Sequence, residues 1–273
     1  ENYSVAHAHA KESERLCLQL GSTHKADLAD ARNLIVYTGE EFISDPIRSR
    51  QAHEKNLKLF QEAGERWMTA HTLFNIGSTF RKTEDFTKAR LVFEQSLAIF
   101  QECGDHFSTA NLNVFLTWIA ITEGKYAEAR LRLEEVISFR RQVRFNIQME
   151  IDLYMLGMVA LREGDHARAK AWFSECLLFV QQIGVDRQIA ECLIGLASIA
   201  SAEKRFEQAV QIAGAAEMQV EARRFPLGSI DRTELKQLRD VLHEELGHEY
   251  FEAAVAKGRA MTMEQAIEYA LGE

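Results

Sequence analysis

Apolar residues recur along the chain at helical spacing, in pairs of stripes separated by short polar breaks. One such pair lies at residues 73–80 and 89–100, on either side of the polar segment RKTED at 81–85. Apolar positions three and four residues apart indicate amphipathic helices. The pattern therefore predicts a helical hairpin in which each helix has roughly four turns.

The hairpin pattern returns every 40 residues. An alanine recurs in each second helix, at Ala89, Ala129, Ala169 and Ala209. A small side chain precedes each alanine by twelve residues; these positions hold Gly77, Thr117, Gly157 and Ala197. Because one hairpin cannot bury its apolar stripes alone, successive hairpins must stack. We expect the small residues to lie where neighbouring helices cross closely, and a larger side chain there to cost about 1–3 kcal/mol.

This spacing resembles the tetratricopeptide repeat (TPR), whose pattern places an alanine twelve positions after a small residue. A large residue four positions after the alanine also matches, at Phe93, Leu133 and Phe173. The period of 40 residues differs from the usual 34. The bulky fourth position of the family is weaker here and holds Leu73, Asn113, Leu153 and Leu193. The resemblance implies an all-α fold, a right-handed superhelix of antiparallel helix hairpins with a helical cap.

We expect two domains, a repeat array at 1–224 and a carboxyl-terminal helical cap at 225–273. The array begins with a half repeat and continues with five units, at about 4–21, 26–65, 66–105, 106–145, 146–185 and 186–224. The first full unit is degenerate, with Tyr37 at the small site and Ser49 at the alanine site.

The cap follows a predicted linker, RRFPLGSIDR at 223–232. Asp231 and Glu234 have the spacing of a capping box and predict the start of its first helix. Thr262 and Gln265 predict the start of its last helix in the same way.

The tail LGHEYFEAAVAKGRAMTMEQAIEYAL at 246–271 is similar to the ends of large bacterial regulators. Those are signal-transducing NTPases, often with LuxR-type or cyclase modules. The resemblance implies a regulatory arm for signal transduction or transcription regulation, with an NTPase or DNA-binding module upstream. The first residue is Glu1, so we expect a piece of a longer chain. No GxxxxGK[ST] loop occurs here, so NTPase activity is not transferred.

Composition narrows the class of partner. The net charge is −9, with acids and bases interspersed, which argues against direct binding to nucleic acid. No apolar run reaches the roughly 18 residues of a membrane span. The four cysteines, Cys17, Cys103, Cys176 and Cys192, show no CxxC spacing, so we expect reduced thiols and a cytoplasmic location.

The sequence contains few candidates for catalysis or metal binding. HEELGH at 243–248 is one residue longer than the HExxH motif, which separates His243 from His248 by about 140° on a continuous helix. His7 and His9 are two residues apart and point to different sides of a helix. SAEK at 201–204 fits SxxK without its companion motifs. We therefore expect no catalytic residue, metal ion or cofactor, and a protein that is not an enzyme.

The TPR resemblance also implies a binding groove, because the first helices of successive units line the inner surface. Carried over by position, the groove holds Phe74, Arg81, Lys82, Asn111, Val114, Trp118, Ile121, Tyr154, Met158, Leu161 and Arg162. Its middle is unusually apolar for a surface, and contiguous exposed apolar area indicates a partner.

Three interpretations of this groove remain open. It binds a protein or peptide, with Arg81, Lys82 and Arg162 pairing with acidic groups. Alternatively, it is filled by the chain's own carboxyl-terminal helices or by a second copy of the chain. Or these side chains pack against neighbouring helices, because the assignment comes from a 34-residue repeat. The first predicts a protein-binding or ligand-sensing scaffold, and a second copy predicts a scaffold that homodimerises.

Overall fold

The computed structural model describes residues 2–21, 24–39, 44–145, 148–184, 188–222 and 227–272. Within these residues the chain forms fourteen α-helices and no strand. The helices form two compact units, Glu1–Glu123 (unit 1) and Gly124–Glu273 (unit 2). The predicted all-α class is thus confirmed, and each unit is described by itself.

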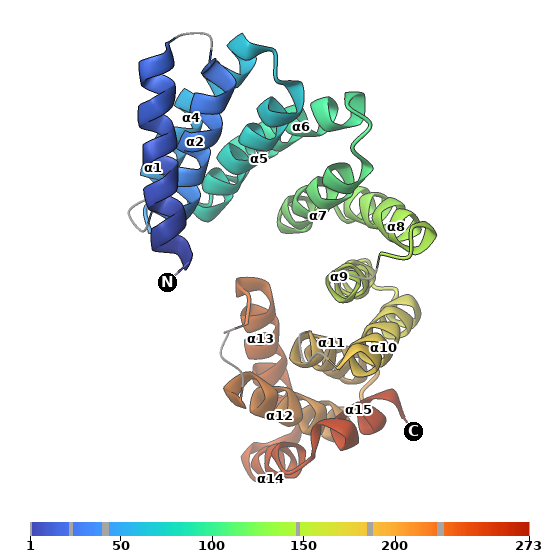
Figure 1. Ribbon diagram of the computed structural model, residues 1–273. Coiled ribbons are helices and arrows are strands. Elements are labelled where there is room, and N and C mark those ends of the chain that lie inside the picture. The colour runs from blue at the N-terminus through green and yellow to red at the C-terminus, as the bar shows by residue number, and fades with distance from the viewer. Residues whose placement is uncertain are drawn as a thin grey trace. The chain divides into compact units, whose positions relative to one another are not determined.

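Unit 1 is a row of antiparallel helices in which each helix packs against the next in sequence (Figure 1). Its helices are α1 (Asn2–Leu20), α2 (Lys25–Thr38), α4 (Pro46–Ala63), α5 (Arg66–Lys82), α6 (Phe86–Glu102) and α7 (His106–Thr122). Three of them begin at an aspartate whose carboxylate accepts backbone N–H groups of the first turn, namely Asp45, Asp85 and Asp105. These caps satisfy amides that have no partner inside the helix, which fixes where each helix starts.

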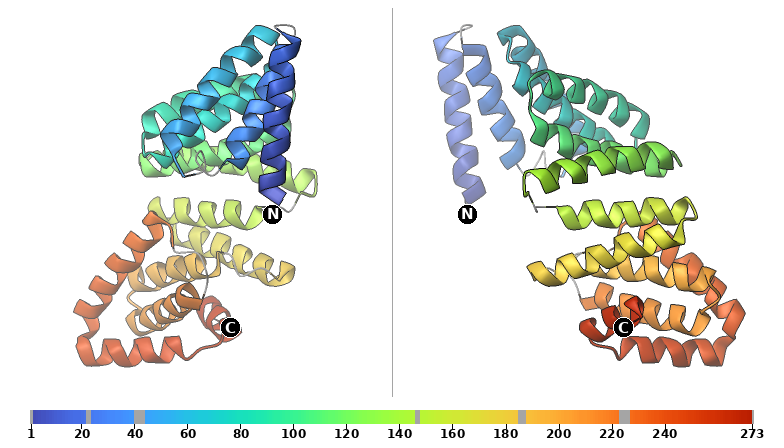
Figure 2. Two further views of the ribbon diagram at one scale, coloured as in Figure 1. Left: turned by 60° about the vertical axis from the view of Figure 1, so that its left-hand side comes forward. Right: turned by 90° about the vertical axis from the view of Figure 1, so that its right-hand side faces the viewer.

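Unit 2 contains further antiparallel helices and the three helices of the predicted cap region. Its helices are α8 (Tyr126–Gln142), α9 (Met149–Arg162), α10 (His166–Ile183), α11 (Ile189–Ala202), α12 (Phe206–Ala222), α13 (Ser229–Leu246), α14 (His248–Arg259) and α15 (Met263–Leu271). The last three helices gather around α12 (Figures 1 and 2). A Cβ atom on Gly214 would lie 2.7 Å from the carbonyl oxygen of Val255, and one on Gly258 would overlap the carbonyl of Gln211. The backbones of α12 and α14 therefore pack in near contact.

The recurring alanines lie in the core, as the repeat pattern predicts. Ala89, Ala129, Ala169 and Ala209 are each 0% exposed. Each lies on a helix that the repeat pattern predicts to be the second of a hairpin, and at a fully buried position a larger side chain would displace its neighbours. The register of these alanines is therefore a packing constraint.

The glycines of the small sites have a different reason from the expected one. A Cβ on Gly157 would lie 2.5 Å from the ring of Phe173. A Cβ on Gly195, two residues before the small site at Ala197, would lie just as close to the same ring. Phe173 of α10 is thus held between glycines of α9 and α11. In unit 1, a Cβ on Gly77 would lie 2.6 Å from the ring of Phe93. An aromatic ring, rather than a neighbouring backbone, occupies the space at these glycines.

The first repeat departs from this arrangement. Tyr37 aligns with the small site, yet it is 42% exposed to solvent. The ring of Tyr37 lies 5.9 Å from the buried ring of His53, the residue that aligns with Phe93. Burial lowers the pKa of His53 to about 4, so this imidazole is neutral near pH 7. A tyrosine fits here because it points outward instead of filling the hairpin.

Unit 2 contains a buried ion pair between α8 and α9. Arg140 Nε lies 3.1 Å from Asp152 Oδ2, and the two side chains are 1% and 0% exposed. Gln148 Oε1 accepts a hydrogen bond from Arg140 Nη2 at 3.3 Å. The pKa of the Asp152 carboxyl is raised to about 7. Burial is the main cause, the buried Glu150 adds to the rise, and Arg140 opposes it.

The start of the cap differs from the predicted one. Helix α13 begins at Ser229 after Gly228 and has no side-chain cap, so a capping box of Asp231 and Glu234 is the wrong assignment. Their carboxylates instead contact α9 and α11, as described below. At α15 the predicted capping box of Thr262 and Gln265 is confirmed. Part of the predicted linker, residues 223–226, lies outside the described residues.

Two further expectations concern the whole chain. All four cysteines are free thiols, and Cys176 and Cys192 are fully buried. None of the helices in the described residues combines the length and the apolar character needed to cross a bilayer.

We predict that Gly157→Ala destabilises the protein by about 1–3 kcal/mol, because the new methyl group would overlap the Phe173 ring. Urea unfolding measures this loss as a shift in the midpoint. In the double variant Gly157→Ala with Phe173→Leu, the smaller side chain makes room for the methyl group. The two substitutions should therefore be less than additive, and strict additivity would contradict the assigned contact.

We also predict that Arg140→Met gives unit 2 a strong pH dependence of stability. The folded chain binds the Asp152 proton more tightly than the unfolded chain, so this group lowers stability as pH rises from about 4 to about 7. Without Arg140 the pKa of Asp152 rises further, and the loss should reach about 3–5 kcal/mol near pH 8.

The matched control is the double variant Arg140→Met with Asp152→Asn, which lacks the titrating group. The difference between single and double variants in urea unfolding should grow with pH. A difference that stays constant between about pH 5 and pH 8 would show that Asp152 does not titrate in this range.

Candidate functional site

Unit 1 carries a continuous row of rings along its first helices. We call it the aromatic strip; it consists of Tyr37 of α2, His71 and Phe74 of α5, and Phe115 and Trp118 of α7. Tyr37 lies 6.3 Å from His71 between ring centroids, and Phe74 lies 5.1 Å from Phe115 in an edge-to-face arrangement. The rings of Phe74, Phe115 and Trp118 are partly exposed. The strip is therefore a partly solvated aromatic surface.

Contacts with Asn75 and with two rings of α6 hold the aromatic strip in place. Asn75 donates a side-chain hydrogen bond to the Tyr37 hydroxyl, which joins α5 to α2. Phe93 of α6 lies 5.9 Å from Phe74 and 5.7 Å from Phe115, and Phe86 packs edge-to-face on Trp118 at 5.2 Å. The second helix of the hairpin thus fixes the rings that the first helices present.

Arg81 lies over one end of the strip. Its guanidinium carbon is 5.5 Å from the Phe115 ring centroid and 5.9 Å from that of Trp118, within the range of a cation–π interaction. Arg81 is half-buried, and its Nε atom has no hydrogen-bond partner. Burial lowers the pKa of Arg81, although an arginine remains charged at neutral pH. Because the Nε atom is itself buried, an anionic group of a partner would have to approach the guanidinium from the exposed part of this half-buried side chain, where it would gain a charge-assisted hydrogen bond.

The other predicted groove residues of unit 1 differ in accessibility. Lys82 and Asn111 are exposed, Val114 is half-buried, and Ile121 is buried. Ile121 therefore supports the surface from beneath, while Lys82 adds a second cation next to Arg81 in sequence. Phe115 was not among the predicted groove residues, because the transferred TPR positions select Val114 instead.

In unit 2 side chains of the chain's own helix α13 contact the corresponding face. The Tyr154 hydroxyl donates a hydrogen bond to Asp231 of α13. Glu234 Oε2 lies 2.7 Å from Arg162 Nη2, and Ser198 Oγ donates to Glu234 Oε1 at 2.8 Å. Burial, together with the Asp231 carboxylate, raises the pKa of Tyr154 well above its usual value. Two predicted groove residues, Tyr154 and Arg162, are thus engaged within the chain.

The remaining predicted residues of unit 2 fit the same picture. Met158 is buried and Leu161 is half-buried. Leu238 and Leu242 of α13 are also buried, so α13 contributes its apolar stripe to the unit. Of the three interpretations of the groove, the second, contact with the chain's own carboxyl-terminal helices, fits Tyr154 and Arg162.

Two histidines near the carboxyl end lie closer together than a continuous helix would place them. Gly247 (φ 73°, ψ 160°) separates α13 from α14, and this break brings His243 Nε2 within 3.3 Å of His248 Nδ1. The expected 140° separation is therefore wrong for this pair. Within the described residues, no group of three or more histidine, cysteine, aspartate or glutamate side chains is placed to hold a metal ion.

Comparison of sequences identifies the repeat. The tetratricopeptide repeat family matches residues 44–102 and again residues 153–178. The first match covers α4, α5 and α6, and the second covers parts of α9 and α10. No curated protein matches the chain significantly.

Comparison of structures gives the same fold. The chain is similar to BtubC (BKLC) from P. vanneervenii, with a TM-score of 0.65 and 15% identity over 84% of this chain and 96% of that one. It is similar to the apo form of RapI, with a TM-score of 0.67 and 11% identity over 94% of this chain and 68% of that one.

A third similar structure consists of the nearly identical TPR-like repeats of a protein described as a kinesin light chain from Podosopora anserina. Its TM-score is 0.53 at 12% identity, over 82% of this chain and 99% of that one. At these identities the likeness concerns the fold alone. The sequence matches and the shared fold together establish that the chain contains tetratricopeptide repeats.

Proposed function

We propose that this chain is a non-catalytic TPR scaffold that binds a protein partner through the aromatic strip and Arg81 of unit 1. The observation that carries the proposal is the position of the half-buried Arg81, whose guanidinium lies over the partly exposed rings of Phe115 and Trp118. Partly exposed aromatic rings and arginine are the residue types enriched at the energetic centres of protein interfaces. A surface of this composition favours a partner with an apolar segment and an acidic group.

The contacts of α13 in unit 2 support this choice of partner chemistry. There the same face of the first helices receives the carboxylates of Asp231 and Glu234, on Tyr154, Ser198 and Arg162. Arg162 lies 80 residues after Lys82, at the same position of the repeat two repeats later. The chain thus supplies its own example of an acidic helix bound to this face. By analogy, Arg81 and Lys82 would pair with acidic groups of a separate protein.

We further propose that the chain is the regulatory arm of a larger bacterial cytoplasmic protein for signalling or transcription regulation. The support is the similarity of its tail, residues 246–271, to the ends of signal-transducing NTPases with LuxR-type or cyclase modules. In that arrangement an NTPase or DNA-binding module lies upstream, and partner binding to the repeats controls it.

We predict that Arg81→Met weakens binding of peptides selected by the chain from a random display library by at least about tenfold. The substitution keeps an apolar side chain over the rings but removes the charge, and a hydrogen bond between charged groups contributes about 1.5–3 kcal/mol. Titration followed by calorimetry measures the affinity. Selected peptides should be enriched in Asp or Glu next to apolar residues, and their affinity should fall as salt rises.

Lys58→Gln is the matched control, because Lys58 is an exposed cation of unit 1 outside the strip. It should leave peptide affinity unchanged, as should Tyr154→Phe in unit 2. Peptides that bind Arg81→Met and Trp118→Ala as tightly as the unaltered chain would contradict the proposed surface. If sedimentation instead shows a stable dimer that Trp118→Ala dissociates, the strip serves self-association and the scaffold homodimerises.

A further inference from the structure

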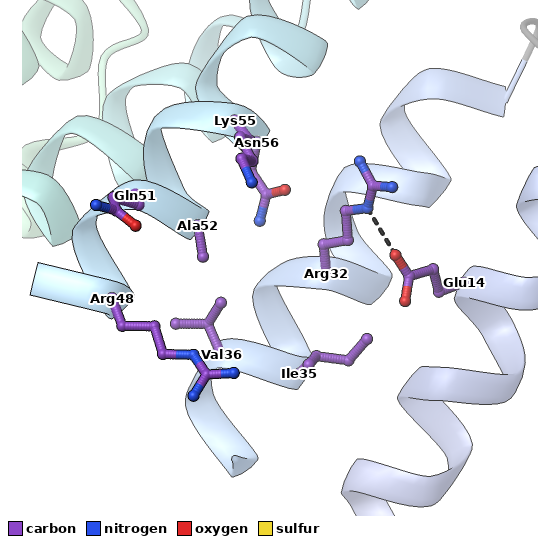
Figure 3. Close-up of a pocket in the computed structure, with 9 residues that line it drawn as sticks. All are labelled: Glu14, Arg32, Ile35, Val36, Arg48, Gln51, Ala52, Lys55 and Asn56. Atoms are coloured by element: carbon purple, nitrogen blue, oxygen red, sulfur yellow. Dashed lines mark hydrogen bonds and ion pairs between the residues drawn. The ribbon is translucent and has the colours of Figure 1, made fainter. Parts of the chain in front are cut away.

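Unit 1 contains a hollow of about 440 Å³ among α1, α2 and α4 (Figure 3). Two polar contacts join the helices around it. Arg32 Nε donates to Glu14 Oε1 at 2.8 Å, the contact drawn in Figure 3, and Asn56 Nδ2 donates to Asn33 Oδ1 at 3.0 Å. These groups hold α1 to α2 and α2 to α4, so they are not free for a ligand. Two histidines of unit 2 are better placed to bind one.

His243 of α13 and His248 of α14 face each other across Gly247, with 3.3 Å between His243 Nε2 and His248 Nδ1. Two nitrogens that bind one tetrahedral ion at 2.0–2.1 Å lie about 3.3–3.4 Å apart. The observed distance is therefore the one that a shared metal ion requires. Each neutral imidazole can carry its proton on its other nitrogen, which leaves both facing nitrogens able to bind metal.

Contacts with the core hold the two rings in this arrangement. The His243 ring packs edge-to-face on Phe251 of α14, with 5.3 Å between centroids, and Phe251 is only 2% exposed. The amide of Gly247 donates to the carbonyl of His243, and the amide of Phe251 donates to the carbonyl of Gly247, both at 3.0 Å. Gly247 has a φ of 73°, which glycine adopts without strain. Both histidines are exposed, so an ion reaches them without any opening of the fold.

The surroundings of the histidine pair are acidic. Residues 240–252 include no lysine or arginine and five carboxylates, namely Asp240, Glu244, Glu245, Glu249 and Glu252. All five are exposed. The arginine that precedes them, Arg239, is paired with Glu217 of α12. A negatively charged surface raises the local concentration of cations, so the charge favours a cation as the ligand.

We propose that His243 and His248 together bind one divalent ion of a late transition metal, Zn²⁺ or Ni²⁺. The two imidazole nitrogens supply two ligands, and water molecules supply the others. Imidazole suits these ions, whereas Mg²⁺ and Ca²⁺ prefer oxygen ligands. The bound ion joins α13 to α14 and stabilises the corner at Gly247. None of these residues belongs to the aromatic strip, so the metal site is independent of the proposed protein-binding surface.

The test is isothermal titration calorimetry of the full chain with Zn²⁺ and with Ni²⁺. We expect saturable binding of at least one of these ions at a 1:1 ratio, with a dissociation constant below about 100 μM. Mg²⁺ is the matched control for the acidic surroundings and should bind at least about tenfold more weakly, because it prefers oxygen ligands.

Single substitutions locate the site. His243→Gln and His248→Gln should each weaken metal binding at least about tenfold, because only one imidazole remains. His9→Gln is the matched control, since His9 is an exposed histidine of α1 in unit 1, and it should leave the affinity unchanged. Absence of saturable binding up to about 1 mM of both ions would overturn the proposal. So would unchanged affinity in the His248→Gln variant, or Mg²⁺ binding as tight as that of Zn²⁺ and Ni²⁺, which would assign the ion to the carboxylates.

Discussion

The packing of unit 2 depends on one aromatic ring held between two glycines. Phe173 of α10 occupies the space that side chains on Gly157 and Gly195 would fill, so one ring joins the first helices of two successive repeats. Protein cores are densely packed, so a methyl group added at either glycine would force the Phe173 ring or a helix to move. The alanine of the same helix, Ala169, is also fully buried. The glycine–phenylalanine pair recurs in the repeat two periods earlier, where Gly77 meets the ring of Phe93 in the same way.

The same repeating geometry produces two different surfaces. In unit 2, the first helices receive α13, and the acidic groups Asp231 and Glu234 are matched by Tyr154, Ser198 and Arg162. In unit 1, aromatic rings occupy the equivalent face, and the half-buried Arg81 lies over two of them. The two faces come from hairpins of the same repeat, and they differ in their side chains and in the presence of α13 on one of them. A scaffold of this kind changes its ligand without changing its fold.

Much of the fold was predictable from the sequence because it depends on local periodicity. Helical spacing, the 40-residue return and the capping residues Thr262 and Gln265 concern neighbours in the chain, and the structure confirms them. The reason for the glycines was not predictable, since it requires knowing that Phe173 lies between α9 and α11. The sequence pattern alone could not distinguish close backbones from an inserted ring.

The candidate site was less predictable than the fold, because it depends on contacts between distant residues. The spacing of Asp231 and Glu234 satisfies a helix cap, yet their carboxylates contact residues 36–77 positions away. Phe115 escaped prediction because positions transferred from a 34-residue repeat select its neighbour Val114. Likewise, Gly247 breaks the helix between His243 and His248 and changes their separation. Site chemistry therefore has to be read from the folded chain.

Native-state hydrogen exchange tests most directly whether the ring between glycines is the centre of the packing in unit 2. Amides in the deepest core exchange only through global unfolding, whereas less packed segments open locally. The account predicts that the slowest amides of unit 2 cluster on α9, α10 and α11 around Gly157, Phe173 and Gly195. If these amides instead exchange as fast as those of α14 and α15, the ring does not organise the unit.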